Sequence, residues 1–361
     1  MSQPIVKPLR ILEISANSPP QICGIGDYTH YLSQALKSRG IEVKTWSGAN
    51  ADYNSPGWTP LAVWRTFHQI KFDQFDVIHL QYEPFGFQQS YLLPFLLARC
   101  GTRLIVTFHE IFQRHKLQVI RDAYLARSAT DLIVNDAGSE IKLRTLVRSD
   151  EAIIHRIGVG SNIPDSTPLH SQDGEIFRLG YFGFLNAVKR VDLLIEALSV
   201  LHRKGETKIR LRLIGDFQAS AGEKSSLESL ARQLNVESAI EWCVGLSGDD
   251  VAKKISECDL MVLPFVDGAT PRRGSFQACL KLGRAVATTL PAAEDSELQL
   301  VTNVLVIEKL DVETVVETVL KAVANPALVK RLEVVSRSLA EKFSWTSIAA
   351  SHHKIYNSTI L

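Results

Sequence analysis

The segment Cys258–Gly283, which reads CDLMVLPFVDGATPRRGSFQACLKLG, decides the fold because it predicts a strand, a loop and a helix in succession. Its apolar run from Asp259 to Pro264 is typical of a strand buried on both faces of a parallel sheet. The residues that follow Arg273 predict a helix with Ser275 as its N-cap and Gly283 as its terminator. Strand, loop and helix in this order form the repeating unit of an α/β fold.

Arg272 and Arg273 place two permanent positive charges just before this helix. The free N–H groups of a helix start, with two guanidinium groups beside them, suit a phosphate or a diphosphate. The alternative is that both arginines are solvated loop charges. The rest of the chain has to decide between the two interpretations.

The same alternation of strands and helices runs along the whole chain and is interrupted once, from Gly158 to Gly174, by a linker rich in Gly, Ser, Asn, Asp and Pro. The predicted strands are 9–15, 41–46, 75–80, 103–108, 131–135 and 153–157, then 177–182, 209–214, 239–244, 259–264, 284–289 and 304–307. The sequence therefore predicts an α/β protein with two doubly wound Rossmann-like domains that face a cleft, residues 1–165 and 166–342. A last helix is expected over 346–356.

Composition excludes several classes of protein. At 361 residues the chain is too long for one core, and 40 Lys and Arg against 39 Asp and Glu argue against a nucleic-acid binder. The 5 cysteines are scattered without a CxxC pair, so neither a disulfide framework nor a thiolate zinc site is expected. Without a signal-peptide pattern or a membrane-spanning run, we expect a cytoplasmic protein, with peripheral contact at the inner face of a membrane left open.

The loop after the first strand contains Gly24 and Gly26, which allow close backbone approach to a ligand. As a dinucleotide fingerprint this loop is poor, because the third glycine is missing and the loop is too long. It fits better as a flap over a ligand from the opposite domain, and a surface loop with two turn glycines is the alternative.

Polar residues end two further strands of the first domain: Tyr82 and Glu83 follow one, and His109 and Glu110 end the other. The carboxyl ends of parallel strands are where open α/β sheets place ligands. A single histidine there is commonly a structural group, whereas two polar strand ends indicate a site.

In the second domain, the segment from Gly183 to Lys189 joins a strand to a helix. Lys189 lies near the helix start, where a cation is unfavourable unless an anion is present. Together with Arg272 and Arg273 it would give three positive charges at strand ends, which a ligand with two phosphates would explain. No Walker loop, GxSxG, HExxH or suitably placed DxD motif occurs, so no metal is expected on the diphosphate.

These segments, in this order, resemble the retaining glycosyltransferases of family 4, which have the two-domain GT-B fold. The resemblance covers nearly the whole chain, including the glycine loop, His109 and the segment from Gly183 to Lys189. The closing segment from Phe343 to Tyr356 resembles the family's last helix, which implies that residues 343–361 cross back and pack on the first domain.

The resemblance implies roles for individual residues. Gly24 and Gly26 would close over the donor diphosphate, and His109 would lie beside the transferred sugar. Lys189 would bind the phosphates, with Gly183 also on the donor side, and Val244 and Gly245 would flank the nucleobase.

Two departures from the family pattern change the expected site. Phe184 stands where the family usually has an arginine, and no glutamate stands at Thr270 or Ala278, where the family usually has a pair eight residues apart. Arg272 and Arg273 would replace the missing charge. The polar contacts to the donor are expected from Asp267, Gly274, Ser275 and Gln277.

The sequence thus predicts a metal-independent retaining glycosyltransferase that uses a nucleotide-diphosphate sugar and no other cofactor. Its acceptor would be a glycan, a glycolipid or a small molecule, with Tyr82, Glu83 and Glu110 on the acceptor side, and no nucleic acid is expected as partner. The oligomeric state is left open. The alternatives are an inactive GT-B binding or scaffold protein and a sugar-nucleotide epimerase.

Overall fold

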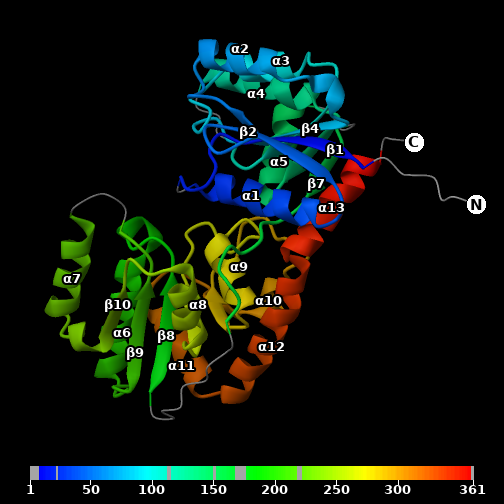
Figure 1. The fold of residues 1–361 in the computed structure, drawn as a ribbon. Helices are drawn as coiled ribbons and strands as arrows, with labels where there is room; N and C mark the ends of the chain where they lie inside the picture. The colour runs from blue at the N-terminus through cyan, green and yellow to red at the C-terminus, as the bar shows by residue number, and fades with distance from the viewer. Residues whose placement is uncertain are drawn as a thin grey trace, which may run out of the picture. The chain divides into compact units, whose positions relative to one another are not determined.

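The chain forms two compact units in the computed structural model, which describes residues 8–21, 23–111, 115–148, 152–166, 176–217 and 222–358. The first unit comprises Met1–Gly160 together with Trp345–Leu361, and the second comprises Ser161–Ser344 (Figure 1). The division falls after Gly160, within the predicted linker, and residues 167–175 of that linker lie outside the described part.

Within the described residues, the first unit is built on a seven-stranded parallel sheet in the order β3-β2-β1-β4-β5-β6-β7. Its strands are β1 (Arg10–Ile14), β2 (Glu42–Ser47), β3 (Tyr53–Asn54), β4 (Val77–Tyr82), β5 (Arg103–Phe108), β6 (Asp131–Val134) and β7 (Ile154–Arg156). Its helices are α1 (Gly24–Lys37), α2 (Pro60–Gln69), α3 (Leu92–Leu97), α4 (Lys116–Ser128), α5 (Ala137–Val147) and α13 (Trp345–Asn357).

The two faces of this sheet bury alternate residues of the same strands, as the two-residue period of a strand requires. Ile11, Val77 and Ile105 pack in one cluster with Tyr28 of α1 and Tyr356 of α13. The strand residues that alternate with these three lie on the opposite face of the sheet and pack in a second cluster with α2, α3, α4 and α5. Helices α1 and α13 lie side by side on one face, so the expected return of the last helix to the first unit is confirmed (Figure 1).

The second unit has a six-stranded parallel sheet among its described residues, in the order β10-β9-β8-β11-β12-β13. The strands are β8 (Phe177–Phe182), β9 (Ile209–Ile214), β10 (Ile240–Cys243), β11 (Leu260–Leu263), β12 (Val286–Thr288) and β13 (Leu305–Val306). The helices are α6 (Val191–Arg203), α7 (Glu223–Gln233), α8 (Gly248–Ser256), α9 (Gly274–Lys281), α10 (Leu300–Asn303), α11 (Val312–Val323) and α12 (Pro326–Lys342). Short 3₁₀ turns occur in the first unit at η1 (Phe72–Gln74) and in the second unit at η2 (Ala187–Lys189) and η3 (Glu237–Ala239).

Both sheets are doubly wound, as predicted. The second sheet is covered by a single continuous core, because its strands contribute apolar side chains to both faces. No helix among the described residues combines the length and apolarity that crossing a membrane requires.

The predicted N-cap of the helix after Arg273 is wrong. Helix α9 begins at Gly274 with Arg273 in the capping position and no side-chain cap. Ser275 therefore lies in the first turn of α9 and does not cap it. Gly283 has φ +64°, in the left-handed region, so its role as terminator is confirmed.

Candidate active site

The strand order of the second unit reverses between β8 and β11. From β8 the chain proceeds outward through β9 and β10, whereas β11 lies on the other side of β8 and leads to β12 and β13. A crevice at the carboxyl ends of the two central strands is where doubly wound sheets bind ligands. The loops that leave β8 and β11 contain the residues from Gly183 to Lys189 and the residues from Pro264 to Arg273.

Gly183 directly follows β8 and makes a close backbone approach to the loop after β9. It has φ +151°, and its N–H donates to the carbonyl of Ile214 over 3.0 Å. A Cβ on Gly215 would lie 2.0 Å from the Gly183 carbonyl oxygen. Glycine at both positions therefore brings the two loops together at the carboxyl edge of the sheet.

Lys189 lies in the short turn η2, just before helix α6, and its side chain is half-buried. The Asn186 side chain accepts a hydrogen bond from the Lys189 N–H over 2.9 Å, which fixes the backbone of this turn. The neighbouring Arg190 adopts the left-handed conformation at φ +58° and lies 3.5 Å from the carboxylate of Asp192. Phe184, which stands where the resemblance to family 4 glycosyltransferases implies an arginine, is exposed.

Arg272 and Arg273 share one carboxylate. Arg273 forms an ion pair with Asp267, and a guanidinium nitrogen of Arg272 lies 3.9 Å from the other oxygen of that carboxylate. The Arg273 guanidinium also lies over the ring of Phe265, 5.2 Å from its centroid. Both arginines are thus held in place and are not solvated loop charges. Two positive charges against one negative charge leave the segment cationic.

The loop that contains Asp267 is itself fixed to the sheet. Gly268 has φ +83°, and a Cβ at this position would lie 2.2 Å from the backbone nitrogen of Pro291. The N–H of Ala269 donates to the carbonyl of Thr289 over 3.0 Å. Asp267 therefore stands on a rigid turn, where it orients both arginines.

Gln277 and Thr270 are buried in this segment, and the polar contact to the donor expected of Gln277 stays a prediction. The Gln277 amide nitrogen donates to the carbonyl of Pro271 over 3.2 Å and holds the loop against α9. Gly274 is exposed and Ser275 is half-buried at the start of that helix, where backbone N–H groups are available to an anion.

Val244 and Gly245 follow strand β10 at the same edge of the second sheet. Val244 is exposed, and Gly245 has φ +68°. The Gly245 N–H donates to the carboxylate of Asp216 over 2.8 Å, which ties this loop to the end of β9. The second unit thus brings Gly183, Lys189, Val244, Gly245, Asp267, Arg272, Arg273, Gly274 and Ser275 to loops at one edge of its sheet.

In the first unit, Gly24 and Gly26 form the first turn of helix α1. A Cβ on Gly26 would lie 2.8 Å from the carbonyl oxygen of Asn17, so this glycine permits close packing of the preceding loop. Gly24 has open space around its Cβ position. Ile22, within the predicted flap, lies outside the described residues.

His109 follows strand β5 and is buried, with 6% of its surface exposed. Its Nε2 lies 2.9 Å from the Gln81 side-chain oxygen, and the ring packs edge-on against Tyr28 with 5.0 Å between centroids. Its backbone N–H donates to the carbonyl of Tyr82 over 3.1 Å.

The predicted acceptor-side residues behave differently from one another. Tyr82 is buried in the core and its hydroxyl donates to Asp122 over 2.7 Å, and its acceptor-side role stays a prediction. The Glu83 carboxylate accepts from the N–H groups of Phe85 and Gly86 over 2.8 and 2.5 Å, and therefore shapes the loop after β4. Glu110 is half-buried next to His109.

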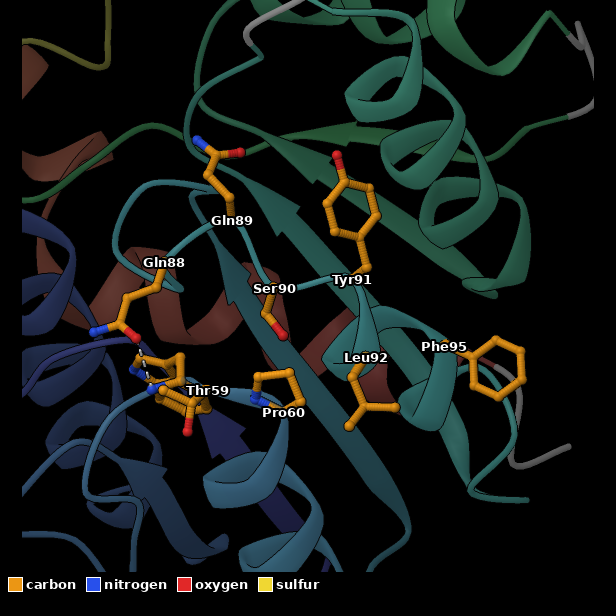
Figure 2. A pocket seen from close by; sticks show the side chains of 9 residues that line it. Thr59, Pro60, Gln88, Gln89, Ser90, Tyr91, Leu92 and Phe95 are labelled. Carbon is orange, nitrogen blue, oxygen red and sulfur yellow. Dashed lines mark hydrogen bonds between the residues drawn. The ribbon is translucent and has the colours of Figure 1, made fainter.

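An open pocket of about 590 Å³ lies beyond this loop, in the first unit. Its lining residues are Trp58, Thr59, Pro60, Gln88, Gln89, Ser90, Tyr91, Leu92 and Phe95. Figure 2 shows the side chains of Gln88 and Gln89 on one side and the rings of Tyr91 and Phe95 on the other. The sequence analysis missed this pocket, because its walls come from two loops about thirty residues apart that no motif connects.

Buried polar contacts fix the loop that forms the pocket wall. Gln88 and Gln89 both adopt the left-handed conformation, at φ +50° and +57°. Arg121, which is buried, donates to the backbone and side-chain oxygens of Gln89 over 3.2 and 3.1 Å and lies 5.1 Å from the centroid of the Tyr91 ring. Consecutive non-glycine residues in this strained region are a feature of functional loops.

Among the described residues, no group of three or more His, Cys, Asp and Glu side chains is arranged to hold a metal ion. Metal independence stays a prediction. The cations that could neutralise an anion at the second sheet are Lys189, Arg272 and Arg273.

Two parallel-sheet α/β units and a last helix that returns to the first unit define the GT-B fold of glycosyltransferases. The chain is similar over 97% of its length to a glycosyltransferase from Rickettsia africae, covering 98% of that chain at 14% identity and a TM-score of 0.78. It is similar over 96% of its length to sucrose-phosphate synthase from Thermosynechococcus elongatus, covering 98% of that chain at 16% identity and a TM-score of 0.74. The chain is also similar over 97% of its length to HepE of Anabaena, solved with UDP and glucose. This match covers 100% of the HepE chain at 14% identity and a TM-score of 0.71.

Residues 176–325 match the family model described as Glycosyl transferases group 1. The matched residues lie within the second unit and include Lys189, Arg272 and Arg273. A search among curated proteins gave no match.

Proposed function

We propose that this protein is a retaining glycosyltransferase of family 4 that moves a hexose from a nucleotide-diphosphate sugar to a glycan, glycolipid or small-molecule acceptor without a divalent metal. The observation that carries the proposal is that Lys189, Arg272 and Arg273 follow the neighbouring strands β8 and β11, where the second sheet reverses its strand order. Three cations beside two loop backbones and a helix start suit a diphosphate.

In the proposed reaction the acceptor hydroxyl oxygen bonds to the anomeric carbon of the donor sugar, and the bond from that carbon to the phosphate oxygen breaks. The acceptor's proton passes to the departing phosphate oxygen on the same face of the sugar, so the configuration is retained. Negative charge develops on the diphosphate as the bond to the anomeric carbon breaks and before the proton reaches its oxygen. The cations stabilise this charge without reorganising, because Asp267 and Phe265 already hold Arg273 in place. In this proposal Gly24 and Gly26 close over the diphosphate, and Val244 and Gly245 flank the base.

A binding screen tests the donor assignment. We expect calorimetric titration with UDP, GDP and ADP, each with a chelator present, to show binding of at least one of them. UDP is tried first because HepE was solved with it. Hydrolysis of the matching nucleotide sugars then identifies the donor, and the configuration of the released sugar reports retention. If none of the three binds, the chain is the scaffold protein that was the alternative.

We propose that the pocket beside Tyr91 binds a sugar ring of the acceptor. A pyranose has an apolar face that packs on an aromatic ring and hydroxyls that bond to amides, and this pocket offers the Tyr91 and Phe95 rings opposite two glutamine side chains. Its ordered loop, held by Arg121, requires little rearrangement on binding.

The Tyr91→Ala variant is expected to raise the KM for the acceptor by roughly 5- to 30-fold, since one ring contact contributes on the order of 1–2 kcal/mol. Its KM for the donor should stay unchanged, because no contact to the donor is proposed for Tyr91. The matched control is Trp64→Ala, which removes another exposed ring, on helix α2, that does not line the pocket. Equal acceptor KM values for the Tyr91 variant and the wild type would contradict the assignment.

A further inference from the structure

A chain of buried polar side chains connects the interior of the first sheet to His109. Glu13 lies on β1, and His79 and Gln81 lie on β4. Glu13 and His79 are direct neighbours in the parallel register, and Gln81 is two residues further on the same face. All three side chains are inaccessible to solvent. Polar groups buried this deeply cost stability unless they bond to one another, so their arrangement is specific.

Gln81 connects Glu13 to His109, and the other contacts of Glu13 are to His79 and Tyr356. The Gln81 amide nitrogen donates to one oxygen of Glu13 over 3.0 Å, and the Gln81 amide oxygen lies 2.9 Å from Nε2 of His109. The other Glu13 oxygen lies 3.0 Å from Nδ1 of His79. Helix α13 closes the cluster, because the hydroxyl of Tyr356 lies 2.7 Å from the same His79 nitrogen and donates to Glu13 over 3.2 Å.

The chemistry of Glu13 determines the orientation of the Gln81 amide. Burial by itself raises the pKa of the Glu13 carboxyl, but the neighbouring His79, by charge and hydrogen bond, and the bond from Gln81 bring that pKa below its ordinary value. An ionised carboxylate only accepts hydrogen bonds, so the Gln81 nitrogen must face it. The Gln81 oxygen then faces His109, and an oxygen accepts only from a protonated ring nitrogen.

We propose that Glu13 acts through Gln81 as a positioning residue that keeps the proton of His109 on Nε2. In the neutral ring the lone pair then resides on Nδ1, so this edge of the imidazole accepts hydrogen bonds from groups such as hydroxyls. The placement of that edge beside the transferred sugar rests on the proposed function. The position of the proton does not, because it follows from the contacts within the first unit.

The test reads the protonation of the His109 ring directly, by ¹⁵N spectroscopy of the full chain without ligand. His109→Gln identifies the signal among the 10 histidines. In the wild type we expect Nε2 to be protonated. In Glu13→Gln the new side chain can donate, the Gln81 amide can reverse, and the His109 ring should shift to a mixture of tautomers or to Nδ1–H.

Two further variants keep the test decisive. Gln81→Leu removes the acceptor next to Nε2 and should also release the tautomer, which covers the case that Glu13→Gln does not fold. Thr107→Val is the matched control, because Thr107 is buried in the same cluster but contacts Nε2 of His79, over 2.8 Å. It should leave the His109 signal unchanged.

An unprotonated Nε2 in the wild type would overturn the proposal, and so would a wild-type His109 signal in both Glu13→Gln and Gln81→Leu. If the tautomer shifts as expected while no nucleoside diphosphate binds, the positioning role stands and the proposed function fails. If the protein is active, Glu13→Gln should lower kcat by roughly two- to tenfold, the effect of one hydrogen bond.

Discussion

The Arg272→Ala variant is expected to bind the nucleoside diphosphate roughly 10- to 150-fold more weakly than the wild type, which corresponds to one charge-assisted hydrogen bond of about 1.5–3 kcal/mol. The physical reason is that Arg272 lies directly before helix α9, where its guanidinium group can donate to a phosphate at the helix start. Its removal should change the free energy of unfolding little, because an ion pair that is partly exposed contributes little to stability. Calorimetric titration and a melting curve measure the two effects separately.

The matched control is Arg210→Ala. Arg210 lies in the same sheet but at the amino end of β9, where it donates to the backbone carbonyl of Thr207 over 2.6 Å. This variant also removes one positive charge from the second unit, so it measures how far the loss of charge alone weakens binding of the nucleoside diphosphate. Equal affinities in the Arg272 variant, the Arg210 variant and the wild type would rule out a diphosphate at this edge.

The Glu333→Ala variant is expected to destabilise the protein by about 3–5 kcal/mol, the cost of leaving a buried charge without its partner. Glu333 of α12 lies 3.1 Å from Arg284, whose side chain has 1% of its surface exposed. Arg284 also donates to the carbonyl of Cys258 over 3.1 Å. Burial lowers the pKa of Arg284, and the charge of Glu333 acts against this shift. The measured Tm should fall by roughly 6–20 °C.

Two variants give this prediction its controls. Glu228→Ala removes an exposed partner of Lys224, at 3.8 Å, and should change the free energy of unfolding by less than about 0.5 kcal/mol. Replacing the buried pair together, with Arg284→Met and Glu333→Leu, should recover most of the lost stability, because no charge then stays buried. A Tm for Glu333→Ala that equals that of Glu228→Ala would contradict the argument.

Strand positions were predictable from the sequence wherever an apolar run had a polar border. The predicted strands 103–108, 177–182 and 209–214 coincide with β5, β8 and β9. Helix starts were less predictable, because α1 and α9 begin without a side-chain cap and so lack the signal on which such a prediction depends. Strand β3, only two residues long, carries no periodicity at all.

The sequence predicted which charged residues lie in the candidate site, but it did not predict which of them form ion pairs. Arg272, Arg273 and Asp267 are recognisable as charged loop residues, yet their ion pairs depend on the turn that Gly268 fixes against Pro291. Tyr82 was assigned to an acceptor surface because it ends a strand. The face on which a strand residue lies depends on register and on the helices that cover the sheet.

Glu13 is a signal in the sequence for a buried polar cluster. A glutamate in the middle of an apolar strand, at a position buried by the two-residue period, needs polar partners. That pattern indicates a buried polar cluster, but it cannot identify His79, Gln81 and Tyr356 as its members. Tyr356 lies more than three hundred residues away along the chain.

The segment Cys258–Gly283 determined by itself that the chain forms strand, loop and helix, and that two arginines precede the helix. This information is local, because hydrophobic periodicity and helix termination involve residues a few positions apart. Only the tertiary structure decided that the two arginines share Asp267, that the segment pairs with strand β8, and that Gln81 joins His109 to Glu13. Such contacts depend on which strands pair and which helix covers them, and a local pattern does not contain that information.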